Sequence, residues 1–210
     1  MPVPDSSRDS ADGAEAPLAG REIVVCVSGG IAAYKTAAAV SRLVQSGAGV
    51  TVCMTRNARR FITPLTFRAL TGRPVLTSAW ETSDGGSIEH LRRSETADLI
   101  LVAPATANVI GKLAGGIADD LVSALLLGAA CPVLMAPAMN TRMWEHAAVR
   151  RNIDFLRNAG VRFIGPEEGW LACRAVGAGR MSEPDEILDG VREIVRTLPL
   201  PRRCGSAATP

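Results

Sequence analysis

The chain contains almost no lysine, because its positive charge is nearly all arginine and only Lys35 and Lys112 are lysines. Histidine is equally scarce, with only His90 and His146. The 23 basic and 21 acidic side chains leave a net charge of +2. Such a small excess does not predict a partner that is a nucleic acid or an anionic membrane.

Long hydrophobic runs are also missing, since none reaches the roughly 18 residues that a membrane span needs. Residues 1–20 have neither the basic start nor the apolar segment of a signal peptide, and their Ser, Asp, Ala and Pro content predicts a disordered tail. We expect a similar flexible tail at 199–210. A single domain over 21–198 is therefore predicted.

The five cysteines form no CxxC motif and no cluster with histidine, so no metal is expected. Cys26, Cys53 and Cys131 lie in or beside apolar runs, which is typical of small core residues. The pattern favours a reducing, cytoplasmic compartment.

Predicted strands and helices alternate along the chain. Expected strands are 22–27, 49–54, 98–103, 132–136 and 161–164, and expected helices are 31–45, 56–70, 117–127, 141–158 and 183–196. This βαβ alternation predicts an α/β fold with a doubly wound, open parallel sheet of flavodoxin-like Rossmann type. Residues 83–87 and 165–179 are expected to be flexible interruptions.

The turn after the first strand has the sequence Ser28-Gly29-Gly30-Ile31. Glycines permit a tight turn, and the following helix offers free N–H groups to an anion. The turn lacks both GxGxxG and the Walker ending, so neither a dinucleotide nor ATP is favoured. The simpler interpretation, a turn without a ligand, stays open.

A second segment combines an apolar strand with a polar residue at its end. The run Val133–Ala136 ends at Pro137, and Met139-Asn140 follows. Ligands bind at the carboxyl ends of strands in open α/β sheets, so the Asn140 amide could point into an apolar pocket. Alternatively, Asn140 only caps the strand end and its neighbours Met139, Met143 and Trp144 only pack.

Two segments together, Pro104-Ala-Thr-Ala-Asn108 and Pro137-Ala-Met-Asn-Thr-Arg-Met-Trp144, resemble the paired signatures of the homo-oligomeric flavin-dependent cysteine decarboxylases. That family includes phosphopantothenoylcysteine decarboxylase and the peptidyl-cysteine decarboxylases of ribosomal peptide natural products. The resemblance runs from about Arg21 to Arg196.

The resemblance implies that the cofactor is FMN. The positions that match the family's FMN contacts are Ser28, Gly30, Ile31, Thr55, Thr66, Phe67, Ala105, Thr106, Asn108 and Ser123. It further implies a homotrimer, with a dodecamer built of trimers as a further option, and active sites formed between neighbouring subunits.

The same resemblance implies the catalytic residues His90, Asn140 and Cys173. His90 matches the essential histidine, Asn140 would hold the substrate carboxylate, and Met143 and Cys173 would also contact the substrate. Residues 165–184 resemble a mobile substrate clamp. Its Cys173 matches the cysteine with which phosphopantothenoylcysteine decarboxylases return reducing equivalents to the enethiol, although it could be a loop cysteine without a redox role.

Two substrates remain open. Cys173 favours phosphopantothenoylcysteine, but Glu95 and Thr96 replace the basic residue and Trp of those enzymes, and an acidic side chain repels a phosphate. The chain also ends without a fused ligase domain. We therefore favour the C-terminal cysteine of a precursor peptide, with phosphopantothenoylcysteine as the alternative. A non-catalytic flavin-binding regulatory subunit is a third possibility, disfavoured by the presence of both His90 and Asn140.

Overall fold

The computed structural model describes residues 18–78 and 96–199. His90 and Glu95 lie outside the described residues, as do almost all of the two predicted tails. The predictions for these parts therefore stay predictions.

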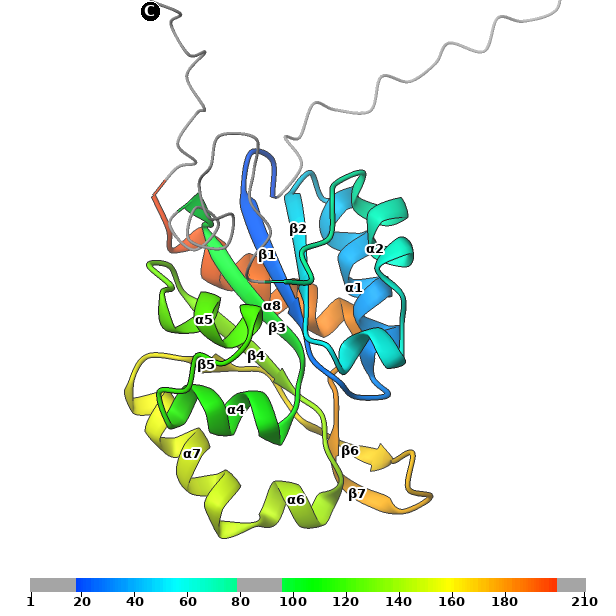
Figure 1. Ribbon diagram of the computed structural model, residues 1–210, viewed down its shortest axis with the longest axis vertical. Helices are drawn as coiled ribbons and strands as arrows, with labels where there is room; N and C mark the ends of the chain where they lie inside the picture. Colours follow the sequence, from blue (N-terminus) through cyan, green and yellow to red (C-terminus); the bar gives the residue numbers. More distant parts are fainter. Residues whose placement is uncertain (1–17, 79–95, 200–210) are drawn as a thin grey trace, which may run out of the picture.

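The centre of the fold is a five-stranded parallel sheet in the order β2-β1-β3-β4-β5 (Figure 1). The strands are β1 (Glu22–Val27), β2 (Gly49–Met54), β3 (Leu99–Ala105), β4 (Val133–Pro137) and β5 (Arg162–Phe163). Because β1 lies between β2 and β3, the chain reverses its direction of winding after β2. This arrangement confirms the predicted doubly wound α/β fold, and such a reversal is where ligands bind in open sheets.

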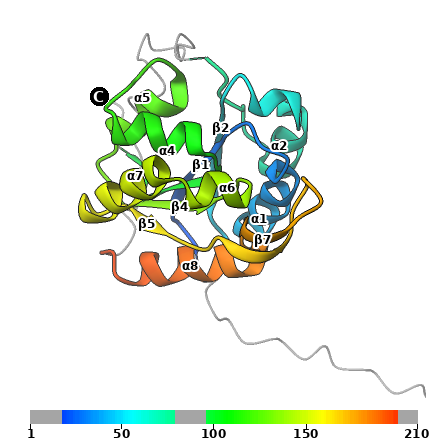
Figure 2. The same cartoon turned by 90° about the horizontal axis from the view of Figure 1, so that it is seen from below.

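Helices cover both faces of the sheet (Figure 2). One face carries α1 (Ala33–Gln45) and α8 (Pro184–Arg196), with α2 (Pro64–Thr71) against α1. The other carries α4 (Ala107–Ala114), α5 (Leu121–Leu127) and α7 (Ala147–Asn158). Among the described helices, none combines the length and apolar character needed to cross a bilayer.

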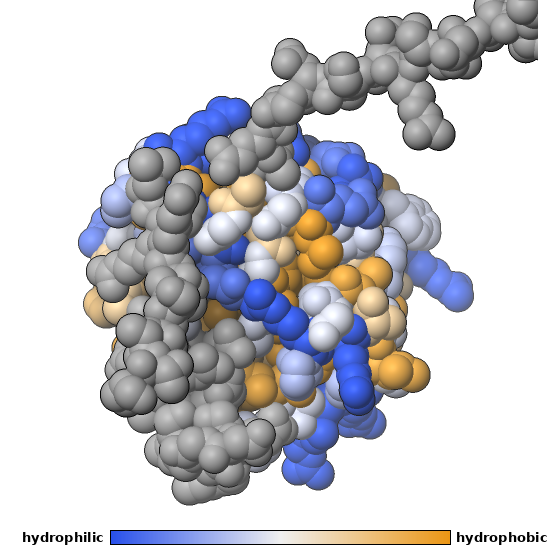
Figure 3. Space-filling model, turned by 90° about the horizontal axis from the view of Figure 1, so that it is seen from above, coloured by the Kyte–Doolittle hydropathy of each residue, from blue (hydrophilic) through white to orange (hydrophobic). Residues whose placement is uncertain are grey.

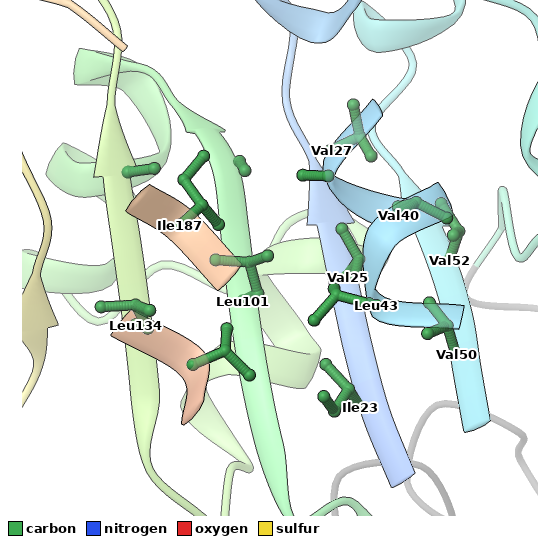
Figure 4. Close-up of a cluster of buried hydrophobic side chains, with 14 of the residues drawn as sticks. Ile23, Val25, Val27, Val40, Leu43, Val50, Val52, Leu101, Leu134 and Ile187 are labelled. Atoms are coloured by element: carbon green, nitrogen blue, oxygen red, sulfur yellow. The ribbon is translucent and has the colours of Figure 1, made fainter. Parts of the chain in front are cut away.

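Two apolar layers fill the space between the sheet and its helices. Figure 4 shows the first, in which Val25 of β1 lies beside Leu43 of α1. In the same layer, Ile187 of α8 lies beside Leu101 of β3. Strands buried on both faces are expected to be continuous apolar runs rather than alternating ones. That property explains why the sequence predicted β1 to β4 well.

Figure 3 shows the end of the molecule at which the amino ends of the sheet strands lie. Hydrophilic and hydrophobic surfaces are interspersed on the coloured part of this end. The polar turns and the site discussed below lie at the other end.

Three helix predictions were wrong in their extent. The helix expected over 141–158 is two helices, α6 (Thr141–Glu145) and α7, because His146 adopts an extended backbone conformation (φ −62°, ψ 131°). Its Nδ1 accepts a hydrogen bond from the Ala148 N–H at 3.2 Å, so it caps α7 rather than lying within a helix. The helix expected from residue 117 begins only at Leu121, since Asp120 caps it.

The helix expected over 56–70 is also divided. A short 3₁₀ turn, η1 (Ala58–Arg60), precedes α2, which begins at Pro64. Proline is favoured at the first helical position and disfavours helix in the residue before it. Helix α4 was not predicted at all, because its first residues belong to the signature segment that directly follows β3.

Residues 165–179 were expected to be a flexible interruption, but they contain an ordered antiparallel hairpin. Its strands are β6 (Glu167–Trp170) and β7 (Val176–Arg180). The Met139 N–H donates to the Gly179 carbonyl oxygen at 3.0 Å, which docks the hairpin on the chain that leaves β4. The predicted clamp therefore has a defined position beside the carboxyl end of the sheet (Figure 1).

Candidate functional site

A cavity of about 1270 Å³ lies at the carboxyl ends of the strands. Figure 2 looks toward this end of the molecule, where α1, α4, α6 and β7 meet. The segments that line the cavity include 28–32, 55–57, 106–109, 138–140, 170–173 and 179–181. The fold thus brings the glycine turn, both signature segments and the hairpin to one place.

Ser28 joins the ends of β1 and β3. Its hydroxyl donates to the Pro104 carbonyl oxygen at 2.6 Å and lies 3.0 Å from the hydroxyl of Thr106. It also accepts from the Thr106 N–H at 3.2 Å. The Ser28 side chain is buried, so these bonds hold the two strand ends together at the floor of the cavity.

The turn after β1 offers backbone amides to an anion. In the described part of the chain, no hydrogen-bond acceptor is assigned to the N–H groups of Gly29, Ile31 and Ala32, which precede α1. Amides left free at the start of a helix, together with the helix dipole, favour a phosphate. These groups fit the phosphate of a mononucleotide such as FMN.

The loop after β2 closes this cradle from the other side. A Cβ atom on Gly29 would lie 2.5 Å from the Asn57 Cβ, so only glycine allows the two loops to approach this closely. The Thr55 Oγ1 accepts from the Ala58 N–H at 3.1 Å and shapes the loop. Both Thr55 and Asn57 line the cavity.

Asn140 caps the short helix α6 and lines the same cavity. Its Oδ1 accepts from the Met143 N–H at 2.9 Å. Because the oxygen is committed to the backbone, the amide nitrogen is the end left to donate. A fixed N–H donor in a cavity is suited to a carboxylate.

The β6–β7 turn brings Cys173 to the cavity. Two backbone hydrogen bonds of 2.9 Å close the turn. The Leu171 N–H donates to the Ala175 carbonyl oxygen, and the Arg174 N–H donates to the Leu171 carbonyl oxygen. Arg174 adopts a positive φ of 63° within it. Cys173 is a free, exposed thiol that lines the cavity, whereas Cys26 and Cys53 are buried in the core as predicted.

A charged network forms the wall beside α4. The Lys112 ammonium lies 2.6 Å from Asp119 and 2.7 Å from Asp120. Burial alone would raise the pKa of Asp120, but hydrogen bonds from Lys112 and from Ser123 outweigh it and hold the pKa below its ordinary value. Lys112 and Asp120 both line the cavity, as does Asn108. This part of the wall is therefore polar and contains an ion pair.

The predicted site residues that lie within the described part of the chain divide into two groups. Those that line the cavity are Ser28, Gly30, Ile31, Thr55, Thr106, Asn108, Asn140, Met143 and Cys173. Thr66, Phe67, Ala105 and Ser123 do not line it in this chain. Phe67 lies in the core against α1, and the Ser123 hydroxyl bonds to Asp120 in the capping box of α5. Cofactor contacts by these four residues stay predictions.

Several cavity residues were not predicted from the sequence, among them Lys35, Lys112 and Arg180. No motif in the sequence marked them, although the only two lysines of the sequence both line the cavity. Among the described residues, no group of three potential ligands could hold a metal ion.

Comparison with protein families defines the class. A family model described as Flavoprotein matches residues 13–196, so the chain belongs to the flavoprotein family. It is 53% identical over 171 residues to the coenzyme A biosynthesis bifunctional protein CoaBC of Bacillus subtilis (strain 168). The match covers 81% of this chain and 42% of that relative, so the chain spans about two fifths of the relative's length.

Two solved structures are similar over most of their length. A cysteine-to-serine mutant of PPC decarboxylase complexed with pantothenoylaminoethenethiol matches with a TM-score of 0.75 and 28% identity, covering 84% of this chain and 99% of that one. The FMN-dependent cysteine decarboxylase SpaF matches with a TM-score of 0.74 and 31% identity, covering 85% and 97%. These matches confirm the resemblance, the FMN cofactor and the decarboxylase class, a carboxy-lyase.

Proposed function

We propose that this protein decarboxylates phosphopantothenoylcysteine with FMN as its cofactor. The observation that carries the proposal is a single cavity that is lined by Asn140, by Cys173 and by the glycine turn. That combination provides a site for a carboxylate, a thiol close to the reacting carbon, and a cradle for a mononucleotide phosphate.

The choice of substrate reverses the preference drawn from the sequence. Glu95 and Thr96 favoured a peptide, but the 53% identity to a coenzyme A biosynthesis protein supports phosphopantothenoylcysteine. The position of Cys173 supports it as well, since this thiol lies on the cavity wall rather than on a remote loop. Glu95 lies outside the described residues, so its effect on a substrate phosphate stays a prediction.

When bound, FMN supplies the redox chemistry by taking two electrons from the cysteine side chain and later returning them. The amide of Asn140 orients the carboxylate so that the breaking C–C bond is aligned for the loss of CO2. The backbone bond from Met143 holds the amide in that orientation. His90 is proposed to accept the thiol proton, and it lies outside the described residues.

Cys173 completes the cycle in this proposal. Loss of CO2 from the oxidised substrate leaves an enethiol, which must gain two electrons and two protons to become a saturated thiol. Cys173 donates one of these protons at the carbon as the reducing equivalents return. The net change is the loss of CO2 alone, about 44 mass units, whereas an enzyme that stops at the enethiol removes about 46.

We also propose that the active unit is a homotrimer in which His90 is supplied by a neighbouring chain. The rim of the cavity supports this, because large apolar side chains are exposed there. Ile31 is 57%, Tyr34 63%, Met143 43% and Trp170 64% exposed. Apolar groups gathered at the mouth of a site indicate a covering partner. A neighbouring copy of the same chain would cover these side chains. Analytical ultracentrifugation tests whether the protein is a trimer in solution.

Mass spectrometry of reaction products tests the proposed activity. Purified protein loaded with FMN is incubated separately with phosphopantothenoylcysteine and with a peptide ending in cysteine. We expect a loss of about 44 from the first and no change in the second. A loss of about 46 from the peptide, with the pantothenate compound unchanged, would restore the peptide assignment.

Two variants locate the chemistry. Cys173→Ser should stall on phosphopantothenoylcysteine at the product lighter by about 46. His90→Asn should abolish turnover while FMN stays bound. Unchanged formation of the fully reduced product in Cys173→Ser contradicts its role as the proton donor.

A further inference from the structure

Two cations on the cavity wall share one carboxylate. Lys35 from α1 and Arg180 from β7 both approach Glu183, which precedes α8. All three residues line the cavity. Two positive charges and one negative charge leave a net charge of +1 on this wall.

The Glu183 carboxylate pairs more closely with Lys35 than with Arg180. The Lys35 ammonium lies 2.7 Å from the Glu183 Oε1 and also donates to the Met181 carbonyl oxygen at 3.2 Å. The hydrogen bond from Lys35 holds the pKa of Glu183 below its ordinary value. The Arg180 Nη2 lies 3.5 Å from the same oxygen, beyond the usual range of a strong charge-assisted bond. The uncompensated charge is therefore that of Arg180.

Arg180 is held in place without being neutralised. Its side chain crosses the partner strand of the hairpin at Gly169, where an added Cβ would lie 3.1 Å from the Arg180 Nε. This Nε is buried and has no hydrogen-bond partner in the described part of the chain. A guanidinium that is held in position and keeps an unpartnered donor is suited to bind an oxyanion such as a phosphate.

Other cations in the cavity are committed or differently placed. Lys112 is bound by Asp119 and Asp120. Arg56 directly follows the Thr55 that shapes the cofactor cradle. Arg180 instead belongs to the hairpin that carries Cys173, directly after the Gly179 that docks on Met139. Arg180 is therefore on the substrate side.

We propose that Arg180 binds the phosphate monoester of the substrate and so makes the site selective for phosphopantothenoylcysteine over its unphosphorylated form. This inference rests on the proposed function. A phosphate keeps its charge throughout the reaction, so a cation there contributes binding without opposing the chemistry. A cation on the carboxylate would stabilise the ground state from which CO2 must leave.

The test compares phosphopantothenoylcysteine with pantothenoylcysteine, which lacks the phosphate, in wild-type protein and in Arg180→Gln. We expect kcat/KM for the phosphorylated compound to fall about 30- to 100-fold, and that for the other compound to change less than about 3-fold. Arg180→Lys should recover part of the loss, since it keeps the charge but not the fork of donors. Arg151→Gln, an exposed arginine on α7, is the matched control and should change neither value.

Two further measurements separate the possible anions. Gly169→Ala displaces the guanidinium without removing its charge, and it should reduce selectivity in the same direction as Arg180→Gln. Titration of the apoprotein with FMN should give the same dissociation constant, within about 3-fold, for wild type and Arg180→Gln. A loss of FMN affinity above about 10-fold would assign Arg180 to the cofactor phosphate and overturn the inference.

The outcomes also separate this inference from the proposed function. An equal loss for both compounds in Arg180→Gln would assign the residue to the shared cysteine carboxylate and overturn this inference alone. Unchanged selectivity in Arg180→Gln would likewise overturn only this inference. Wild-type protein that decarboxylates neither compound overturns the proposed function and this inference together.

Discussion

The side-chain oxygen of Asn140 accepts the backbone N–H of Met143 at 2.9 Å, and this bond determines which end of the amide faces the cavity. An aspartate would make the same cap, because Asp and Asn are comparable at this position. It would, however, have no donor to offer and would repel a carboxylate. Stability and catalysis can therefore be separated at this residue.

The first prediction uses that separation. Asn140→Asp should retain the melting temperature and the bound FMN but lose decarboxylation. Asn140→Ala should lose activity and also about 1 kcal/mol of stability with the cap. Thermal unfolding and product analysis measure both effects, and Glu145→Gln on the same helix is the control. An active Asn140→Asp protein would remove Asn140 from the mechanism.

The second prediction concerns the docking of the hairpin. Gly179 has a φ of +132°, and a Cβ there would collide with the Met139 carbonyl oxygen. Gly179→Ala should detach the hairpin at a cost of about 1–3 kcal/mol, which corresponds to a loss of about 5- to 160-fold in kcat/KM. FMN affinity should hardly change.

Gly111→Ala is the matched control, since the new Cβ would make only an ordinary contact at 3.7 Å with Asn152. It replaces a glycine inside α4 and should stabilise that helix by up to about 1 kcal/mol. Hydrogen exchange of residues 167–180 provides a second measurement. Unchanged protection in Gly179→Ala would show that the hairpin does not depend on this contact.

The third prediction is a pH dependence of stability from Asp120. Its pKa in the folded protein is lowered, so its stabilising contribution is complete above the unfolded pKa of about 3.9 and is lost as the pH falls through the folded pKa. Asp120→Asn keeps an N-cap for α5 but removes the charge that faces Lys112. We expect wild type to be more stable by about 1 kcal/mol at pH 7, and the difference to shrink once the pH falls below the unfolded pKa of about 3.9.

Denaturant unfolding across this pH range measures the difference. Asp154→Asn is the control, because its pair with Arg157 is exposed and long, at 3.8 Å. Such a pair contributes little. A difference for Asp120→Asn that stays constant throughout acid unfolding would contradict the role given to the Lys112 ion pair.

The fourth prediction concerns thiol reactivity. Burial raises the pKa of Cys131 to about 11, and the hydrogen bond that the neutral Cys26 thiol shares with Cys53, together with burial, raises the pKa of Cys26. Cys173 is exposed on its turn. In a Cys204→Ser protein at pH 8, iodoacetamide should therefore modify Cys173 first and leave Cys26 unmodified until the protein unfolds.

Peptide mapping after timed labelling checks the order. Labelling in denaturant is the control, since all the cysteines should then react together. If Cys26 reacts as fast as Cys173 in the folded protein, the core around β1 and β2 opens more often than its burial indicates. Protection of Cys173 by added FMN and substrate would agree with its place in the cavity.

The parallel sheet could be predicted because each central strand is buried on both faces and leaves a continuous apolar run. Helix boundaries were less predictable where a single residue decides them. His146 divides α6 from α7 through its own backbone conformation, and Asp120 delays α5 by capping it. The apolar periodicity of the sequence continues across both residues, so the pattern alone predicts longer helices than the structure has.

The candidate site was predicted where motifs carry it and missed where folding creates it. Asn140, Thr106 and Cys173 belong to recognisable segments and reach the cavity. The Lys35 ammonium meets the Met181 carbonyl 146 residues later in the chain, a contact that no local pattern indicates. The Arg180 side chain reaches the cavity only because the hairpin docks on the chain that leaves β4, which the sequence does not show.

The position of Trp170 allows movement of the clamp to be followed by tryptophan fluorescence. It stands on β6 at the rim of the cavity with 64% of its surface exposed, whereas Trp144 is buried. Energy transfer from an excited indole to a flavin falls steeply with distance, so any movement of the hairpin alters the emission lifetime of Trp170. In a Trp80→Phe protein, Trp144 would give a constant component and Trp170 a variable one. The opening and closing of the substrate clamp can then be timed in unlabelled protein during turnover.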